Sequence, residues 1–214
     1  MVAPAPIPAT PAADCALCPR LAAFRGENRL AHPGWFHAPV PGFGRHDARL
    51  LVLGLAPGLR GANRTGRPFT GDWAGDLLYA TLLKFGLARG TYAADPNDGL
   101  ELVGTRIVNA VRCVPPGNKP LPAEIATCNG FLKAELAAMK RLRVIVALGR
   151  IAHDAALRAK GLRPSRHAFG HGAQHTLPDG TMLADSYHCS RYNTNTNRLT
   201  TPMFEAVFQA LPTG

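Results

Sequence analysis

The sequence has few acidic residues and no long apolar segment. Only 14 of its 214 residues are Asp or Glu, against 24 Lys and Arg, which leaves a formal net charge of +10. No apolar run reaches the ~18 residues that a membrane-spanning helix needs. The opening MVAPAPIPATPAAD lacks the basic region and long apolar stretch of a secretory signal. We therefore expect no membrane span and a cytoplasmic location.

Lysine is scarce as well, because only five of the 24 basic residues are lysines. Positive charge in excess favours a polyanionic partner, since neutralising phosphates releases counterions. The alternative explanation is a genome with biased codon usage, which encodes Arg where others encode Lys. Charge informs about partners and not about the fold. Nucleic acid is the expected partner.

Two common phosphate-binding motifs are missing. Neither the Walker pattern G-x4-G-K-[ST] nor the dinucleotide pattern G-x-G-x-x-G occurs. The first apolar run leads instead into GLAPGLRGANRTGRPFTGDWAG, residues 54–75. Backbone N–H groups of such a Gly-rich loop hold anions, and Arg60, Arg64 and Arg67 stand within it. The loop is expected to contact phosphate or nucleic acid, with a flexible surface loop as the alternative.

Apolar segments alternate with helical patterns along the chain. Strands are predicted at 49–55, 105–111 and 143–149, and Asp-Gly between two short strands within 173–186 predicts a hairpin. Helices are predicted at 73–88, 122–140, 151–160 and about 200–211. This order indicates an α/β layered fold with a largely parallel sheet. Residues 1–14 are expected to be a flexible tail before one domain over 15–214, irregular at 15–47.

Three polar segments are expected to meet at one edge of that sheet. Ligands of such sheets bind beyond the carboxyl ends of the strands. The Gly-rich loop follows the first strand, and Asn109 ends the second. His188 follows the last strand and opens HCSRYNTNTNR.

Four cysteines have the spacing of a metal site. Cys15, Cys18, Cys113 and Cys128 give the pattern C-x2-C…C-x14-C. A reducing compartment keeps thiols free, and four soft ligands suit tetrahedral zinc or an iron–sulfur cluster. The spacing leaves the metal open, and buried small hydrophobes are the alternative. Cys189 and His188 are not expected to form a catalytic Cys–His pair, since neighbouring residues in a strand point to opposite faces.

Three segments, GLAPGLRGANRTGRPFTGDWAG, VNAVRCVPPGNKPLPAEIATC and HCSRYNTNTNRLT, resemble the uracil-DNA glycosylase superfamily. The resemblance is strongest to its family 5, the type B enzymes of bacteria and archaea, and spans about residues 15–212. It implies a three-layer α/β/α fold with a central four-stranded, mainly parallel sheet. It also implies a [4Fe–4S] cluster on the four cysteines, with zinc as the alternative, and removal of deaminated bases from DNA.

The resemblance also implies site residues. Phe69 resembles the aromatic that stacks on the flipped base, Asn109 the residue that reads the uracil edge, and His188 the catalytic histidine. The related family 4 has an acid where this chain has Leu55, and the replacement acid resembles Asp72. Further substrate contacts are expected at Gly54, Ala56, Pro57 and Gly58. DNA contacts are expected at Arg60, Asn63, Arg64, Arg67, Ser190, Arg191, Tyr192 and Asn193.

These residue types suit the chemistry. A base must leave the duplex to be attacked, and an aromatic face compensates for the lost stacking. The Asn109 amide offers a donor and an acceptor to uracil. His188 would stabilise the departing anion, and Asp72 the cationic sugar or the attacking water. Asp72 also stands where a helix N-cap is expected, so capping is its alternative role.

The expected activity is that of a monofunctional glycosylase, because no lysine appears in a motif segment where a Schiff base would be expected. The protein is expected to be a monomer. A non-catalytic, metal-stapled DNA-binding module and a small-nucleotide hydrolase or transferase are the alternatives. The other histidines, at 32, 37, 46, 153, 167, 171 and 175, are expected to be structural.

Overall fold

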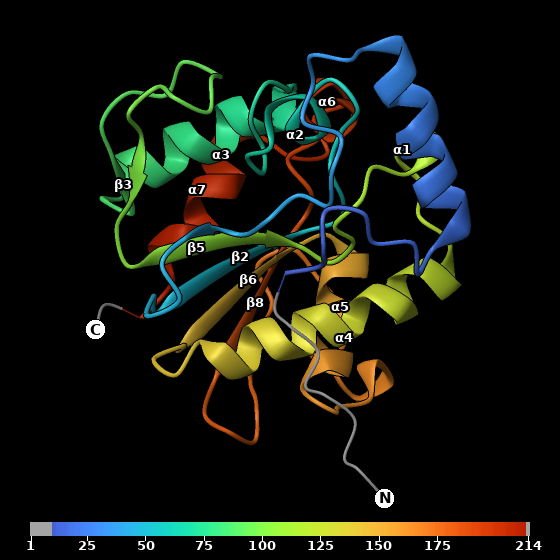
Figure 1. The fold of residues 1–214 in the computed structure, drawn as a ribbon. Coiled ribbons are helices and arrows are strands. Elements are labelled where there is room, and N and C mark those ends of the chain that lie inside the picture. Colours follow the sequence, from blue (N-terminus) through green and yellow to red (C-terminus); the bar gives the residue numbers. More distant parts are fainter. Residues whose placement is uncertain (1–9, 213–214) are drawn as a thin grey trace, which may run out of the picture.

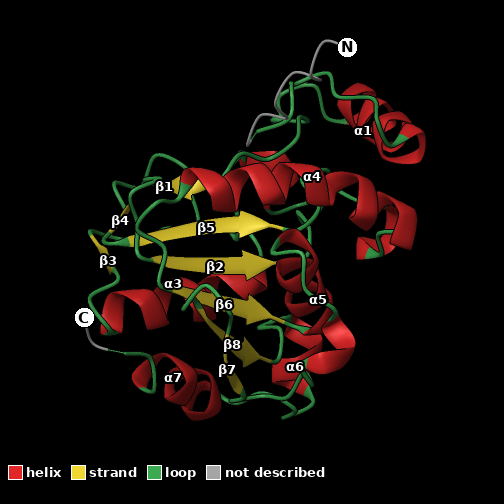
Figure 2. Cartoon of the chain, turned by 90° about the horizontal axis from the view of Figure 1, so that it is seen from below, coloured by secondary structure: helices red, strands yellow, loops and turns green. Residues whose placement is uncertain are grey.

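The three innermost strands are buried at every position, and most of their residues are apolar. In the computed structural model, which describes residues 10–212, the strands β2 (Leu50–Gly54), β5 (Thr105–Asn109) and β6 (Val144–Leu148) are buried throughout. They belong to a six-stranded sheet of order β1-β5-β2-β6-β8-β7 (Figure 2). The inner four strands are parallel, and the edge strands β1 and β7 are antiparallel to their neighbours. The expected four-stranded parallel core is confirmed, with a short antiparallel strand added at each edge.

Helices cover both faces of the sheet and make the expected three layers. Figure 1 shows α3 (Trp73–Lys84) and α7 (Thr201–Gln209) on one face, and α4 (Pro122–Ala138) and α5 (Arg150–Ala159) on the other. Each face has its own apolar core. The remaining elements are β1 (Phe43–Gly44), α2 (Ala62–Thr65), β3 (Ala88–Arg89), β4 (Glu101–Leu102), β7 (Gln174–Thr176), β8 (Met182–Ser186), α6 (Arg191–Asn195) and two 3₁₀ turns at Pro116–Asn118 and Pro164–Arg166.

The expectation of irregular structure at 15–47 is wrong for its first part, because α1 spans Pro19–Ala31. Its inward face consists of Leu21, Arg25 and Asn28. These lie at helical spacing, but two of the three are polar, so no apolar stripe marks the helix in the sequence. Outside this face, Arg20 Nη2 pairs with Glu124 Oε2 of α4 at 2.7 Å.

Of the expected tail at 1–14, residues 1–9 lie outside the described residues. Within the described part, Pro11 is buried and lines a small cavity together with the four cysteines. Pro11 is therefore packed against the protein, whereas Thr10 and residues 12–14 are exposed. No helix within residues 10–212 combines the length and apolar character needed to cross a membrane.

The parallel strands bring distant loops to one edge. Gly54 at the end of β2 is in register with Asn109 at the end of β5. Leu148 at the end of β6 is in register with Ser186 at the end of β8. The segments that follow these residues leave the sheet on the same side, where α/β proteins bind ligands.

A buried ion pair braces the loop that follows β2. The Arg67 guanidinium donates to both carboxylate oxygens of Asp98, at 2.8 and 2.7 Å. Its Cζ also lies 5.2 Å from the ring centroid of Phe43 and 5.4 Å from that of Tyr79. Arg67 holds the pKa of Asp98 well below its usual range. The loop is thus tied to the segment between β3 and β4.

We expect Asp98→Asn to lower the free energy of unfolding at pH 7 by about 3 kcal/mol, because it leaves the buried Arg67 without its counter-ion. Asp98 has a lowered pKa, so its contribution is complete above ~4 and is lost as the pH falls below that value. The difference between wild type and variant should therefore shrink in acid. Denaturant unfolding at several pH values measures both effects.

Asp47→Asn is the matched control, because Asp47 pairs with Arg45 in an exposed position. It should change stability by less than about 1 kcal/mol. Equal unfolding midpoints for Asp98→Asn and wild type at pH 7 would show that the pair does not brace the loop.

Candidate active site

A cavity of about 440 Å³ opens at the carboxyl edge of the parallel strands. Phe69, Asp72, Asn109 and His188 all line it, although they come from segments that are far apart in the chain. Among the other predicted residues, Ala56, Pro57, Gly58, Ser190 and Arg191 also line the cavity. The structure therefore brings the predicted catalytic and base-contacting side chains together at one cavity.

Gly54 lies next to this cavity, and its lack of a side chain leaves room for two of the residues that line it. A Cβ at Gly54 would overlap both Asn109 Oδ1 and the ring of Phe69. Any larger residue would displace the two side chains together. Asn109 is only 3% exposed, and its Oδ1 is buried without a hydrogen-bond partner among the described residues. Buried polar atoms are rarely left unpaired, so this oxygen is available to a ligand.

Phe69 has a backbone conformation that is rare for a residue with a side chain. Its φ is +54°, in the left-handed region. Two contacts hold this segment: the Tyr92 hydroxyl donates to the carbonyl of Phe69 at 3.2 Å, and the Tyr79 hydroxyl donates to that of Pro68 at 2.7 Å. A Cβ at Gly75 would overlap the carbonyl oxygen of Phe69. Backbone strain of this kind persists where the surroundings enforce it, often at functional sites.

Asp72 occupies the N-cap position of α3, but its side chain makes no capping hydrogen bond. The carboxylate instead lies against Gly58 and Gly61, in space that a Cβ at either glycine would take. Its Oδ1 is buried without a partner among residues 10–212. Burial raises the pKa of Asp72, and the N–H groups at the start of α3 partly oppose this rise. Asp72 therefore has the position of a helix cap in the backbone, but its carboxylate lines the cavity.

His188 is a neutral histidine at physiological pH. Burial lowers its pKa to about 4. Its ring centroid lies 6.0 Å from that of Phe69, with 28° between the planes. The Asn193 side-chain amide donates to the His188 carbonyl at 2.8 Å and fixes the main chain there. The site thus presents an uncharged imidazole beside an aromatic ring.

The four predicted metal ligands also converge. Cys15, Cys18, Cys113 and Cys128 are free thiols that line one cavity of about 20 Å³. Arg25 Nη1 donates to Cys113 Sγ at 3.1 Å, and the Arg112 backbone N–H donates to Cys128 Sγ at 3.3 Å. Within residues 10–212, no three of the four sulfurs lie within 4.8 Å of one another. Ligands of a single tetrahedral zinc would be about 3.8 Å apart, so the spacing suits a larger group.

Comparison with known proteins decides the family. A model of the uracil DNA glycosylase superfamily matches residues 41–212. The chain is 50% identical over 196 residues to the type-5 uracil-DNA glycosylase of Thermus thermophilus, covering 89% of each chain. This chain belongs to the uracil-DNA glycosylase superfamily, in its type-5 family. It is also 44% identical over 203 residues to the type-5 uracil-DNA glycosylase of Mycobacterium bovis, covering 91% of this chain and 76% of that one.

A more distant relative is the type-4 uracil-DNA glycosylase of Archaeoglobus fulgidus. It is 38% identical over 114 residues, which cover 53% of this chain and 49% of that one. The type-5 relatives match far more of the chain than this type-4 relative does. The resemblance to family 5 inferred from the motifs is therefore confirmed.

Two of the residues predicted to contact DNA in this glycosylase-family chain have buried side chains. Arg67 is 5% exposed, and its guanidinium is engaged with Asp98 instead of facing solvent. Asn63 is 1% exposed, and its Nδ2 lies 3.2 Å from His37 Nδ1. Arg60 and Arg64 of the same loop are exposed, as the prediction requires.

The DNA contacts predicted in the segment after His188 also include both exposed side chains and side chains with internal hydrogen bonds. Ser190 caps α6 by accepting from the Asn193 backbone N–H at 3.4 Å, so both residues have internal roles. Arg191 is exposed at the cavity, and Tyr192 is 71% exposed. Among the four residues of this segment that were predicted to contact DNA, Arg191 and Tyr192 are the exposed ones.

Sequence reasoning missed Trp73 at this cavity. Trp73 lines the cavity, remains 49% exposed, and donates from Nε1 to Thr194 Oγ1 at 2.9 Å. Arg191 Cζ lies 5.6 Å from its ring centroid. The ring thereby links α3 to α6. Its signal in the sequence is a large aromatic next to Asp72, outside the apolar face of the helix. Asn118, Leu148 and Ile151 also line the cavity and were not predicted.

We expect the imidazole of His188 to remain neutral from pH 8 down to pH 5, because its pKa is about 4 rather than the usual ~6.5. NMR of histidine-labelled protein measures this, with the His188 signal assigned by its loss in His188→Ala. Since the unfolded state takes up the proton first, this residue lowers stability as the pH falls from ~6.5 toward 4. A His188 signal that titrates near pH 6.5 would contradict the lowered pKa and the neutral imidazole.

Proposed function

We propose that this protein removes uracil from DNA by hydrolysing the N-glycosidic bond, leaving an abasic site. The observation that supports this most is the convergence of Phe69, Asp72, Asn109 and His188 on one cavity, in a chain of this family. A cavity of about 440 Å³ has room for a single everted base. A non-catalytic DNA-binding module would leave this convergence without a use.

Recognition of uracil is assigned to Asn109 and Phe69. The buried, unpartnered Oδ1 of Asn109 would accept the N3–H of uracil, and its Nδ2 would donate to O4. Cytosine presents a bare nitrogen at position 3, so two acceptors would face each other in a dry site. Leaving such groups unpaired gives strong discrimination. The ring of Phe69 would stack on the base.

Bond cleavage leaves negative charge on the departing base and positive charge on the sugar. His188 would donate a hydrogen bond to O2 of the base as that charge develops, an oxyanion-type role. Its low pKa allows it to do so as a neutral donor. Asp72, with one oxygen unpartnered, would stabilise the cationic sugar or orient the attacking water. No lysine lines the cavity among the described residues, which fits a monofunctional enzyme.

DNA is held by exposed positive charge around the cavity. The proposal assigns phosphate contacts to Arg60 and Arg64, and entry into the duplex to Arg191 and Tyr192. The net charge of +10 supports a polyanionic partner. The proposal further includes a monomer that acts in the cytoplasm, where five free thiols would remain reduced.

A [4Fe–4S] cluster is the group assigned to Cys15, Cys18, Cys113 and Cys128. The wide spacing of the sulfurs and the two N–H donors directed at them fit an iron–sulfur cluster better than zinc. When bound, the cluster supplies a structural cross-link through four iron–thiolate bonds. The four residues would fasten the start of α1 to the segment after β5 and to α4.

The test of the function uses a labelled oligonucleotide with one uracil, treated with alkali after incubation. We expect a strand break at the uracil and none in a matched cytosine control. His188→Ala should reduce the single-turnover rate at least ~100-fold while DNA affinity changes little, because the imidazole acts on the departing base. A wild-type protein that binds this DNA and releases no base would contradict the proposed function.

Anaerobically purified protein should be brown and contain about four irons per chain. Cys128→Ser should lose the colour and the iron, because it removes one ligand. Cys189→Ser is the control, since Cys189 is buried beside α3 and its Sγ donates to the Ala74 carbonyl. Colourless protein with stoichiometric zinc at the cysteines would exclude the cluster.

A further inference from the structure

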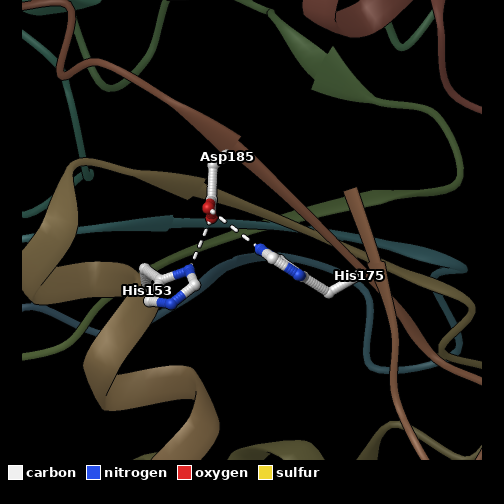
Figure 3. Close-up of side chains that lie close together, drawn as sticks. All are labelled: His153, His175 and Asp185. Atoms are coloured by element: carbon white, nitrogen blue, oxygen red, sulfur yellow. Dashed lines mark hydrogen bonds and ion pairs between the residues drawn. The ribbon is translucent and has the colours of Figure 1, made fainter. Parts of the chain in front are cut away.

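A second group of possible metal ligands lies away from the cysteines. His153 of α5, His175 of β7 and Asp185 of β8 point toward one another (Figure 3). Their ligand atoms all lie within 4.8 Å of one another. His153 and Asp185 are buried, and His175 is partly exposed. The three residues join a helix, an edge strand and an inner strand.

His153 contacts an oxygen acceptor with each ring nitrogen. Its Nδ1 is 2.7 Å from Asp185 Oδ1, and its Nε2 is 2.9 Å from the backbone carbonyl of His167. A neutral imidazole has a single N–H, so it satisfies one of these contacts only. The other nitrogen requires a second proton or a metal ion. A histidine that donates Nε2–H to a carbonyl, with Nδ1 free to ligate, has the usual arrangement of a metal ligand.

His175 supplies the second observation. Its Nε2 is buried without a hydrogen-bond partner among the described residues. It lies 3.6 Å from Asp185 Oδ2, which is too far for a good hydrogen bond. Two ligand atoms on one tetrahedral zinc are separated by about 3.3 Å when the bonds are about 2.0–2.1 Å long. The separation therefore suits two ligands of one ion.

Asp185 supplies the charge that requires compensation. Its carboxylate is 0% exposed. Within residues 10–212 its ion-pair partners are His153 and His175, which carry a charge only when protonated, and no Lys or Arg pairs with it. Burying a carboxylate without a cation is strongly unfavourable. A divalent ion between the carboxylate and the two imidazoles would neutralise it and pair the orphan nitrogen.

We propose that His153 Nδ1, His175 Nε2 and Asp185 bind a structural Zn²⁺ ion. Two imidazoles and one carboxylate suit zinc, and the partly exposed side of His175 leaves the fourth position to water. The Asp185 carboxylate must turn slightly, because its present 2.7 Å contact with His153 is closer than two zinc ligands allow. The ion would fasten the short strand β7 and the helix α5 to β8, three residues before His188.

The histidines concerned were expected to be structural, and their spacing explains why no site was predicted. His153, His175 and Asp185 come from three separate elements and form no short motif. Only the pairing of β7 with β8, and the packing of α5 on the sheet, brings them together.

Titration of the purified protein, cysteines intact and iron content known, with Co²⁺ as a spectroscopic probe tests the proposal. We expect one saturable site with visible d–d absorption and without the intense thiolate charge-transfer band of a cysteine site. Zn²⁺ should displace the Co²⁺. His175→Gln should weaken binding at least ~100-fold, whereas His32→Gln, an exposed control, should bind as wild type.

Thermal unfolding gives a second readout. At a hundredfold excess over Kd, Zn²⁺ should raise the Tm of wild type by about 5 °C or more and leave that of His175→Gln unchanged. Asp185→Asn provides a second variant should His175→Gln fold poorly. The absence of saturable Co²⁺ binding to wild type, a thiolate band, or equal affinity in the folded His175→Gln variant would overturn the proposal.

Discussion

The site depends on three glycines that leave room for functional side chains. Asn109 and Phe69 pack into the space that a Cβ at Gly54 would occupy, and Asp72 does the same at Gly58 and Gly61. The glycines of this segment therefore leave room for these side chains at the cavity. Since Gly54 ends β2 in register with Asn109, the same constraint connects the parallel sheet to the site.

This arrangement is costly for stability. The Oδ1 atoms of Asp72 and Asn109 are both buried without partners among the described residues. Each such group costs about 1–3 kcal/mol, and Phe69 adds backbone strain. The ion pair of Arg67 with Asp98 holds the loop in place against these costs. A base in the cavity would supply the missing partner of Asn109, so this unfavourable group is one that the proposed substrate would satisfy.

The sequence predicts the features that depend on local pattern. The apolar strands can be recognised in the sequence. Because ligands of parallel sheets bind beyond the carboxyl ends of the strands, Asn109 and His188 are predicted at the same edge of the sheet. Helix α1 was not predicted, because the polar residues Arg25 and Asn28 lie on its buried face and interrupt the apolar pattern. The number of arginines in the loop could not reveal that Arg67 is paired with Asp98, 31 residues further along. The group around Asp185 depends on tertiary contacts alone, which no spacing in the sequence records.

The most direct test of the account replaces Gly54 by Ala. We expect the single-turnover rate of uracil release to fall at least ~100-fold, because the added methyl group displaces Asn109 and Phe69 together. DNA affinity and far-UV circular dichroism should remain close to wild type. Gly34→Ala, where a Cβ meets nothing within 4 Å, should behave as wild type. A folded Gly54→Ala variant that releases uracil at nearly the wild-type rate would contradict the proposed geometry of the site.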